Sequence, residues 1–319
     1  MIYLFSAAIK RKSIAGANRN TDEVVDKSPC CASCGITEID NIKLMDCDGC
    51  DLVRYCSDAC RGNHRLEHGE ACKERTAELR DELLFMKPES SHLGDCPICC
   101  VPMPLDRKKS FVYTCCSKTI CNGCNYANQN REIGMRLQST CPFCRELLPK
   151  DKETDEEHDK RMMKRIEAND PAAMTDQGNL QYLNGEYIRA FEYFTKAAEL
   201  GDAQAHHRLA EMYHDGKGVG KDEEMEIHHL EEAAIGGHPI ARYNLGYEEW
   251  RQGNFERAVK HLVIAATLGF DESLEELTKA FKCGLMEKED LAAALRAHQA
   301  AVDATKSPQR EKAGALLSK

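Results

Sequence analysis

The sequence predicts small, cysteine-rich α+β modules in its N-terminal half, followed by an all-α helical-repeat solenoid. Of the 18 cysteines in 319 residues, seventeen lie between Cys30 and Cys144, and only Cys283 lies beyond. After residue 169, apolar residues instead recur at the spacing of paired helices. Hydrophobic residues make up 42% and charged residues 30%, which is ordinary for a chain that buries a core.

The first cysteine cluster consists of four short ligand pairs that suit zinc. In chain order, the pairs are Cys31 and Cys34, Cys47 and Cys50, Cys56 and Cys60, and His68 and Cys72. Zinc prefers four thiolate or imidazole ligands in a tetrahedron, so eight side chains suffice for two ions. Because no coordination position stays open for water, we expect structural zinc. Spacing alone leaves open whether Cys30 replaces Cys31.

The string RYCSDAC over residues 54–60, together with these spacings, resembles the MYND zinc finger, here over residues 30–72. The resemblance implies interleaved pairs: Cys31, Cys34, Cys56 and Cys60 would bind one ion, and Cys47, Cys50, His68 and Cys72 the other. A finger of about 42 residues is too small for a self-sufficient core. Zinc binding, worth roughly 10–16 kcal/mol per site in finger peptides, supplies the missing stability.

A second cluster lies within residues 95–149. Its pairs are Cys96 and Cys99, Cys115 and Cys116, Cys121 and Cys124, and Cys141 and Cys144. The CPIC and CPFCR strings resemble an all-cysteine RING-type finger, which implies that Cys96, Cys99, Cys121 and Cys124 bind one zinc and Cys115, Cys116, Cys141 and Cys144 a second. Adjacent ligands strain a shared tetrahedral site, so Cys100 remains an alternative to one of them. Together the two fingers predict four Zn²⁺ ions.

RING-type ligases perform no covalent step themselves, but hold a ubiquitin-conjugating enzyme so that its thioester reacts, an effect of proximity and orientation. The resemblance implies three contacts with that enzyme: Ile98 in the first zinc loop, Pro142 near the last pair, and the cationic Arg145 after the final ligand. Ile98 and Pro142 are equally compatible with ordinary zinc-loop roles.

The C-terminal half contains a repeated pattern. It comprises Phe191, Phe194, Ala197, Ala198 and Gly201, then Ile227, Leu230, Ala233, Ala234 and Gly237, then Val259, Leu262, Ala265, Ala266 and Gly269. The small Ala-Ala positions allow two helices to approach closely. Residues 169–304 resemble Sel-like repeats, relatives of the tetratricopeptide repeat, with a weaker fourth unit from Asp271. The resemblance implies a right-handed α-solenoid whose concave face binds protein.

The segments between these modules are polar. We expect a disordered N-terminal tail over residues 1–29, a helical connector over 73–94, a charged linker over 150–168 and a flexible C-terminal tail over 305–319. No run approaches the roughly 18 apolar residues of a membrane span, and no signal peptide is evident, which favours the cytoplasm or nucleus.

The charge is unevenly distributed. Residues 1–168 carry 26 basic and 27 acidic side chains, and residues 169–319 carry 17 and 26, so the two parts have net charges of −1 and −9. No basic stripe suits phosphate contacts, so direct nucleic-acid binding is not expected. Disulfide pairing is disfavoured because it requires an oxidising compartment.

The whole arrangement resembles predicted MYND–RING–Sel-repeat proteins of diatoms and related algae. Two functional hypotheses follow. In the first, the chain is a RING-type ubiquitin ligase or ligase subunit, with the second finger recruiting the conjugating enzyme, and the first finger and the solenoid recruiting other proteins. In the second, both fingers only bind proteins, and the chain is a non-catalytic adaptor.

Overall fold

The structure is a computed structural model that describes residues 30–38, 43–148 and 155–317. The predicted tail over residues 1–29 lies outside the described residues. The chain divides into two compact units after Asp81, within a long helix. Among the described residues, no helix is long and apolar enough to cross a membrane.

The first unit is built from a short hairpin and a helix. Strands β1 (Met45–Asp46) and β2 (Arg54–Tyr55) pair antiparallel, and α1 (Asp58–Phe85) begins three residues later. The Tyr55 side chain is buried, and its hydroxyl lies 3.1 Å from His64 Nδ1. The helix therefore starts inside the first finger, well before the connector predicted from residue 73.

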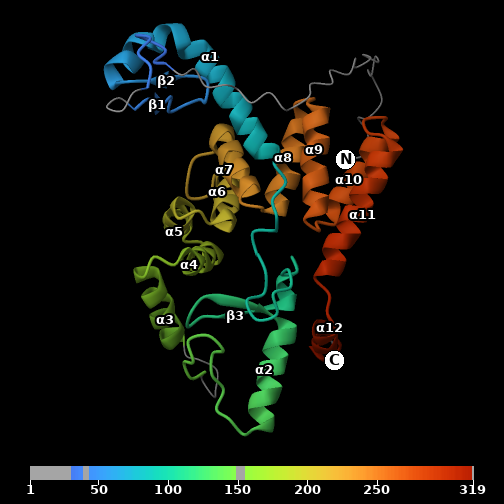
Figure 1. The fold of residues 1–319 in the computed structure, drawn as a ribbon. Coiled ribbons are helices and arrows are strands. Elements are labelled where there is room, and N and C mark those ends of the chain that lie inside the picture. The colour runs from blue at the N-terminus through green and yellow to red at the C-terminus, as the bar shows by residue number, and fades with distance from the viewer. Residues whose placement is uncertain (1–29, 39–42, 149–154, 318–319) are drawn as a thin grey trace. The chain divides into compact units, whose positions relative to one another are not determined.

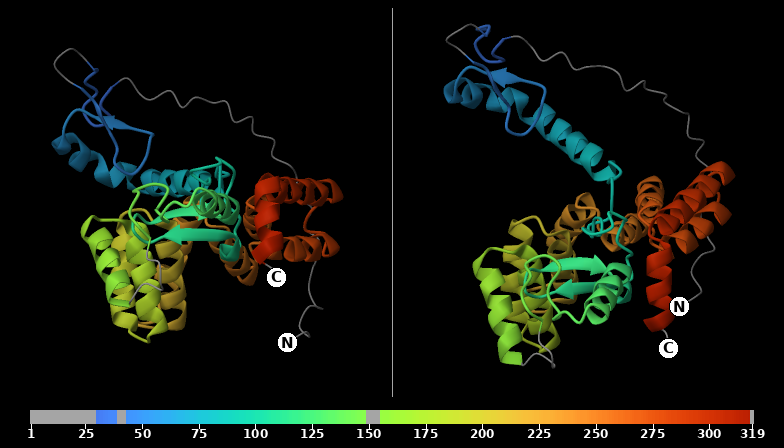
Figure 2. Two further views of the ribbon diagram at one scale, coloured as in Figure 1. Left: turned by 90° about the horizontal axis from the view of Figure 1, so that it is seen from below. Right: turned by 60° about the horizontal axis from the view of Figure 1, so that its bottom comes forward.

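The second finger contains a hairpin of β3 (Ser110–Tyr113) and β4 (Lys118–Cys121), followed directly by α2 (Asn122–Gly134) (Figure 2). A 3₁₀ turn, η1 (Arg107–Lys109), precedes β3. The small core contains Met103, Tyr113 and Ile120, and the ligand cysteines pack among them. This finger lies in the second unit, together with the helical repeats.

The repeat region is a succession of helix pairs in which each helix packs on the next (Figure 1). Its helices are α4 (Pro171–Leu183), α5 (Tyr187–Glu199), α6 (Ala203–Asp215), α7 (Glu223–Ile235), α8 (Pro239–Arg251), α9 (Phe255–Thr267), α10 (Glu272–Lys282) and α11 (Lys288–Ala304). The repeated alanines are buried at every unit. Gly201, Gly237 and Gly269 end α5, α7 and α9 with positive φ, which explains their recurrence.

The last turn of α1 and the segment after it pack on the repeats within the second unit. Leu84 belongs to a buried cluster with Leu230 and Leu245. The guanidinium of Arg242, which is fully buried, donates to the carbonyls of Leu84 and, at 3.5 Å, Met86. These bonds satisfy carbonyls at a helix end, which lack partners within the helix.

Two polar segments form helices. Helix α3 (Asp155–Glu167) occupies most of the predicted charged linker. Residues of the predicted flexible tail form α12 (Pro308–Leu317), where Ala313 is fully buried and the helix packs against α2. The predicted flexible tail is therefore wrong for residues 308–317, which form a helix. Pro308 suits the first turn of a helix, but the burial of this helix depends on its contact with α2, which is far away in the sequence.

Candidate zinc centres

The structure brings the candidate ligands together in four groups of four, and within each group all ligand atoms lie within 4.8 Å of one another. The groups are Cys31, Cys34, Cys56 and Cys60; Cys47, Cys50, His68 and Cys72; Cys96, Cys99, Cys121 and Cys124; and Cys115, Cys116, Cys141 and Cys144. These are the sets that the two resemblances imply. Cys30 and Cys100 belong to none of them.

The distances within the groups suit zinc and are longer than a disulfide bond. A tetrahedron with Zn–S bonds of about 2.3 Å has S···S edges of about 3.8 Å. The sulfurs of Cys99 and Cys121 are 3.8 Å apart, those of Cys47 and Cys72 are 3.7 Å apart, and all the cysteines are free. A disulfide requires about 2.05 Å. The donor set, fifteen thiols and one imidazole, therefore fits four structural Zn²⁺ ions.

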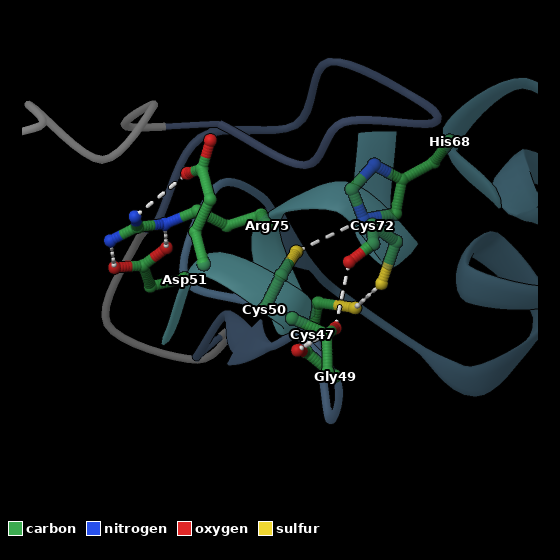
Figure 3. A network of polar contacts seen from close by, with 9 residues as sticks. Cys47, Gly49, Cys50, Asp51, His68, Cys72 and Arg75 are labelled. Atoms are coloured by element: carbon green, nitrogen blue, oxygen red, sulfur yellow. Dashed lines mark hydrogen bonds and ion pairs between the residues drawn. The ribbon is translucent and has the colours of Figure 1, made fainter. Parts of the chain in front are cut away.

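In the first finger, α1 makes the two centres interleave. It supplies Cys60 to one centre, and His68 and Cys72, one helical turn apart, to the other. His68 Nε2 lies 3.2 Å from Cys50 Sγ (Figure 3). His64, a further candidate by residue type, instead contacts Tyr55 and stacks on His68.

Local polar contacts fix the Cys47–Cys50 loop against α1. Arg75 donates two hydrogen bonds to the Asp51 carboxylate, at 2.8 and 2.9 Å (Figure 3). The Thr76 hydroxyl donates to the Gly49 carbonyl. A Cβ at Gly49 would lie 3.1 Å from Cys72 Sγ, so glycine allows the loop to approach the ligand closely. All these partners lie within 30 residues of one another.

Three of the ligand pairs share one backbone turn. In each, the first cysteine's N–H donates to the carbonyl five residues later, and its carbonyl accepts from the N–H four residues later. The residue at this fourth position has positive φ: 75° at Gly35, 51° at Cys100 and 59° at Arg145. Cys100 therefore occupies a turn position, which explains why this extra thiol is not a ligand.

This turn also favours the thiolate that zinc requires. Burial raises the pKa of the Cys96 thiol, but backbone N–H groups of Cys121, Cys99 and Ile98 outweigh it and lower the pKa to about 6. Cys31 follows the same pattern, with burial opposed by N–H groups of Cys34, Cys56 and Ser33, and its pKa is also lowered to about 6. In these two turns the backbone N–H groups thus favour the thiolate of the first cysteine. In the same two centres, hydrogen bonds with Cys34 and Cys60 raise the pKa of Cys56, and burial raises that of Cys124.

The adjacent pair Cys115 and Cys116 lies in the tight turn between β3 and β4. Cys115 Sγ lies 3.4 Å from Cys144 Sγ, and Cys116 Sγ lies 3.5 Å from Cys141 Sγ. Ser117 follows with a φ of 53°. The turn therefore brings both sulfurs to one centre, as the RING-type pairing implies, and Cys100 is not needed there.

The residues implied as contacts for a conjugating enzyme lie on the surface around these centres. Ile98 is 45% exposed, Arg145 is exposed and Pro142 is half-buried. Exposure of an apolar side chain in a zinc loop makes it available to a partner, and the role itself stays a prediction.

A pocket of about 430 Å³ lies on the repeats, lined by residues of α4, α6, α7 and α8. Four carboxylates line it, those of Glu211, Asp215, Glu226 and Glu248, along with the tyrosines Tyr182 and Tyr247. Tyr247 is 59% exposed. The resemblance to Sel-like repeats implied a concave face that binds protein, and residues 169–319 carry a net charge of −9, but neither identifies these residues. Their convergence depends on how successive repeats stack.

Comparisons with known proteins identify two of the modules. Residues 31–72 match the family model of the MYND finger, and residues 178–202, 203–238 and 239–270 match that of the Sel1 repeat. Chitin synthase regulatory factor 4 of Schizosaccharomyces pombe is 33% identical over 86 residues, 27% of this chain. The chain spans only 14% of that relative's length.

Two solved structures are similar, each at 24% identity. The Sel1 repeat protein from Oxalobacter formigenes has a TM-score of 0.41, with 56% of this chain and 73% of the other covered. The protective antigen c5321 of uropathogenic Escherichia coli, which displays an SLR fold, has a TM-score of 0.38, with 52% and 36% covered. By the family matches, the chain contains a zinc-binding MYND finger and three Sel1 repeats, modules that mediate protein–protein interactions.

Proposed function

We propose that this chain is a zinc-stabilised adaptor that binds cationic segments of protein partners in the pocket of its Sel1 repeats. The observation that supports this most directly is the lining of that pocket: four carboxylates and two tyrosines, with one lining arginine, Arg208. Three of the carboxylates already have a cationic partner in the chain, because Arg208 contacts Glu211, Lys217 contacts Asp215 and Arg251 contacts Glu248. A cationic segment would share or displace these partners. Tyrosine supplies apolar contact area together with a polar hydroxyl, and carboxylates favour cationic side chains.

Peptide binding tests this proposal. Fluorescence polarisation with basic, neutral and acidic peptides of about twelve residues is expected to give the tightest binding to the basic set, weakening as salt rises. Tyr247→Ala is expected to weaken it about tenfold. Ile188→Ala, at a 68% exposed position on α5 that does not line the pocket, is the matched control. Equal binding of all three sets would contradict the proposal.

We further propose that residues 95–149 act as a RING-type finger and make the adaptor a ubiquitin ligase or ligase subunit. The supporting observation is the cross-braced grouping of the eight cysteines around an exposed Ile98. In the step concerned, a lysine amine attacks the thioester of the conjugating enzyme, an isopeptide bond forms, and the enzyme's cysteine thiol leaves. The finger supplies orientation, with Ile98, Pro142 and Arg145 as the contacts.

An ubiquitination assay tests the second proposal separately. The full chain with zinc, ATP, ubiquitin, activating enzyme and a panel of conjugating enzymes is expected to form ubiquitin conjugates. Ile98→Ala and Arg145→Ala are expected to reduce the rate at least tenfold, whereas Ile133→Ala, 76% exposed on α2 of the same finger, is not. No conjugates with any enzyme, while peptide binding persists, would leave the adaptor as the function. For both roles we propose a location in the cytoplasm or nucleus.

A further inference from the structure

Helix α12 joins the second finger through its first turn. Ser307 caps the helix, and its hydroxyl accepts the Arg310 N–H at 3.3 Å. The neighbouring Gln309 side-chain amide donates to the Gly123 carbonyl at 2.9 Å, in the first turn of α2. The two helices thus meet at the turn of α2 that carries Cys124, one ligand of a zinc centre.

The guanidinium of Arg310 contacts the turn that holds the ligand Cys99. Its Nη2 donates to the Val101 carbonyl at 2.9 Å and lies 3.5 Å from Cys99 Sγ, while its Nη1 donates to the Pro102 carbonyl at 2.6 Å. Nη1 also donates to the Thr305 carbonyl at 2.7 Å, which follows the end of α11. One side chain therefore connects the zinc turn to the repeat region.

The contact is close because α2 has a glycine where α12 crosses it. A Cβ at Gly123 would lie 2.9 Å from the Arg310 backbone nitrogen and 3.0 Å from its Cα. These are backbone atoms, which cannot swing away as a flexible side chain does. Any larger residue at 123 therefore forces α12 to move. Gly134, at the other end of α2, has open space around its Cβ position.

We infer that Arg310 is a positioning residue for the zinc centre of Cys96, Cys99, Cys121 and Cys124, and that α12 is an integral element of the second finger. A zinc ion with four thiolates carries a net charge of −2, which a guanidinium offsets. N–H donors around metal ligands fix their orientation, and their loss costs about 10- to 100-fold in metal affinity. Arginine suits this position because its planar guanidinium donates hydrogen bonds to several acceptors at once.

Zinc release measures the effect directly. The full chain loaded with four zinc ions is treated with a colorimetric chelator, and release is followed over time. Arg310→Ala is expected to speed loss of one ion about 10- to 100-fold, and Arg310→Lys, which keeps the charge but not the fork, by less. Lys312→Ala, exposed on the same helix, is the control and is expected to match the wild type. Equal release from Arg310→Ala and wild type would overturn the inference.

Two further measurements separate positioning of the metal from simple anchoring of the helix. Gly123→Ala is expected to speed release of the same ion, and Gly134→Ala is not. With ¹¹³Cd in place of zinc, Arg310→Lys is expected to shift the resonance of one all-cysteine centre. If α12 stays docked in Arg310→Lys, as judged by hydrogen exchange at Ala313, and no resonance moves, Arg310 only anchors the helix and the inference fails.

Discussion

The two fingers are braced by contacts between residues at very different separations in the sequence. Each has two interleaved centres and a short hairpin followed by a helix. In the first finger the bracing pairs are local, such as Arg75 with Asp51, 24 residues apart. In the second, Arg310 reaches Cys99 across 211 residues. The first finger is therefore expected to be self-contained, whereas the second depends on residues that follow the repeats.

The largest expected effect is on the zinc content, and it distinguishes the ligand Cys99 from the neighbouring Cys100. Cys99→Ser is expected to lower the metal content from four zinc ions per chain to three, because a structural site in a finger peptide is worth roughly 10–16 kcal/mol. Cys100→Ser, one residue later, is expected to retain four, since that thiol lies outside every ligand group. Elemental analysis of the purified variants measures this. Loss of an ion from Cys100→Ser alone would contradict the assignment.

Removal of residues 306–319 tests whether the second finger depends on residues that follow the repeats. The second finger loses three contacts of the Arg310 guanidinium and the hydrogen bond from Gln309 to the Gly123 carbonyl. At about 0.5–1 kcal/mol each, its opening is expected to become about 2–4 kcal/mol easier. Hydrogen exchange should show this as faster exchange in β3 and β4. In β1, β2 and residues 58–81 of α1 exchange should not change. A matching loss of protection in the first finger would refute the comparison.

Acid is expected to weaken the second unit through His261. This side chain is fully buried against Phe85, and burial, with Arg242 and Arg257 nearby, lowers its pKa to about 3. The unfolded chain has the ordinary value of about 6.5, so below that pH it binds a proton that the folded protein does not. Stability should therefore fall by about 2 kcal/mol between pH 6.5 and 5.

Trp250, the one tryptophan of the chain, reports this unfolding by fluorescence in denaturant titrations at each pH. His261→Leu is expected to reduce the pH dependence by the share of one group without abolishing it, because burial also lowers the pKa of His92 and of His229, each to about 4, in the same unit. An unaltered slope in His261→Leu would show that other groups cause the acid sensitivity.

The smallest effect compares the turns of the two fingers. Gly35 and Cys100 occupy the same left-handed position, which costs residues other than glycine roughly 1–2 kcal/mol. Gly35→Ala is expected to destabilise the first finger by about 1 kcal/mol, and Cys100→Gly to stabilise the second by somewhat less, since glycine gains freedom in the unfolded chain. Thermal unfolding of the zinc-loaded protein measures both. Shifts of the opposite sign would contradict the shared turn.

The ligand sets and the repeats could be predicted because their signals are local. A short pair such as Cys96 and Cys99 defines half of a metal site by spacing alone, and Ala233 and Ala234 mark a close helix contact within one repeat. The sequence also predicted that the adjacent ligands Cys115 and Cys116 would strain a shared tetrahedral site. The structure shows that the hairpin turn aims both sulfurs at one centre.

The roles of Arg310 and of the pocket could not be read from local patterns. The sequence predicted a flexible tail over residues 305–319, and nothing near Ser307 or Pro308 indicates that a helix starts there and meets Gly123. The burial of α12 depends on how the repeats return the chain to the second finger. The pocket likewise collects Tyr182 and Tyr247 from repeats 65 residues apart, through stacking that the repeat period does not specify.

The position of Arg310 has a consequence for biosynthesis. All eight ligands of the second finger have been translated once Cys144 is added, but Arg310 follows 166 residues later. At synthesis rates of about 5–20 residues per second, this delay amounts to roughly 8–33 s. During that interval the finger has its metal ligands but lacks Arg310. Zinc is therefore expected to exchange more readily from the nascent chain than from the finished protein.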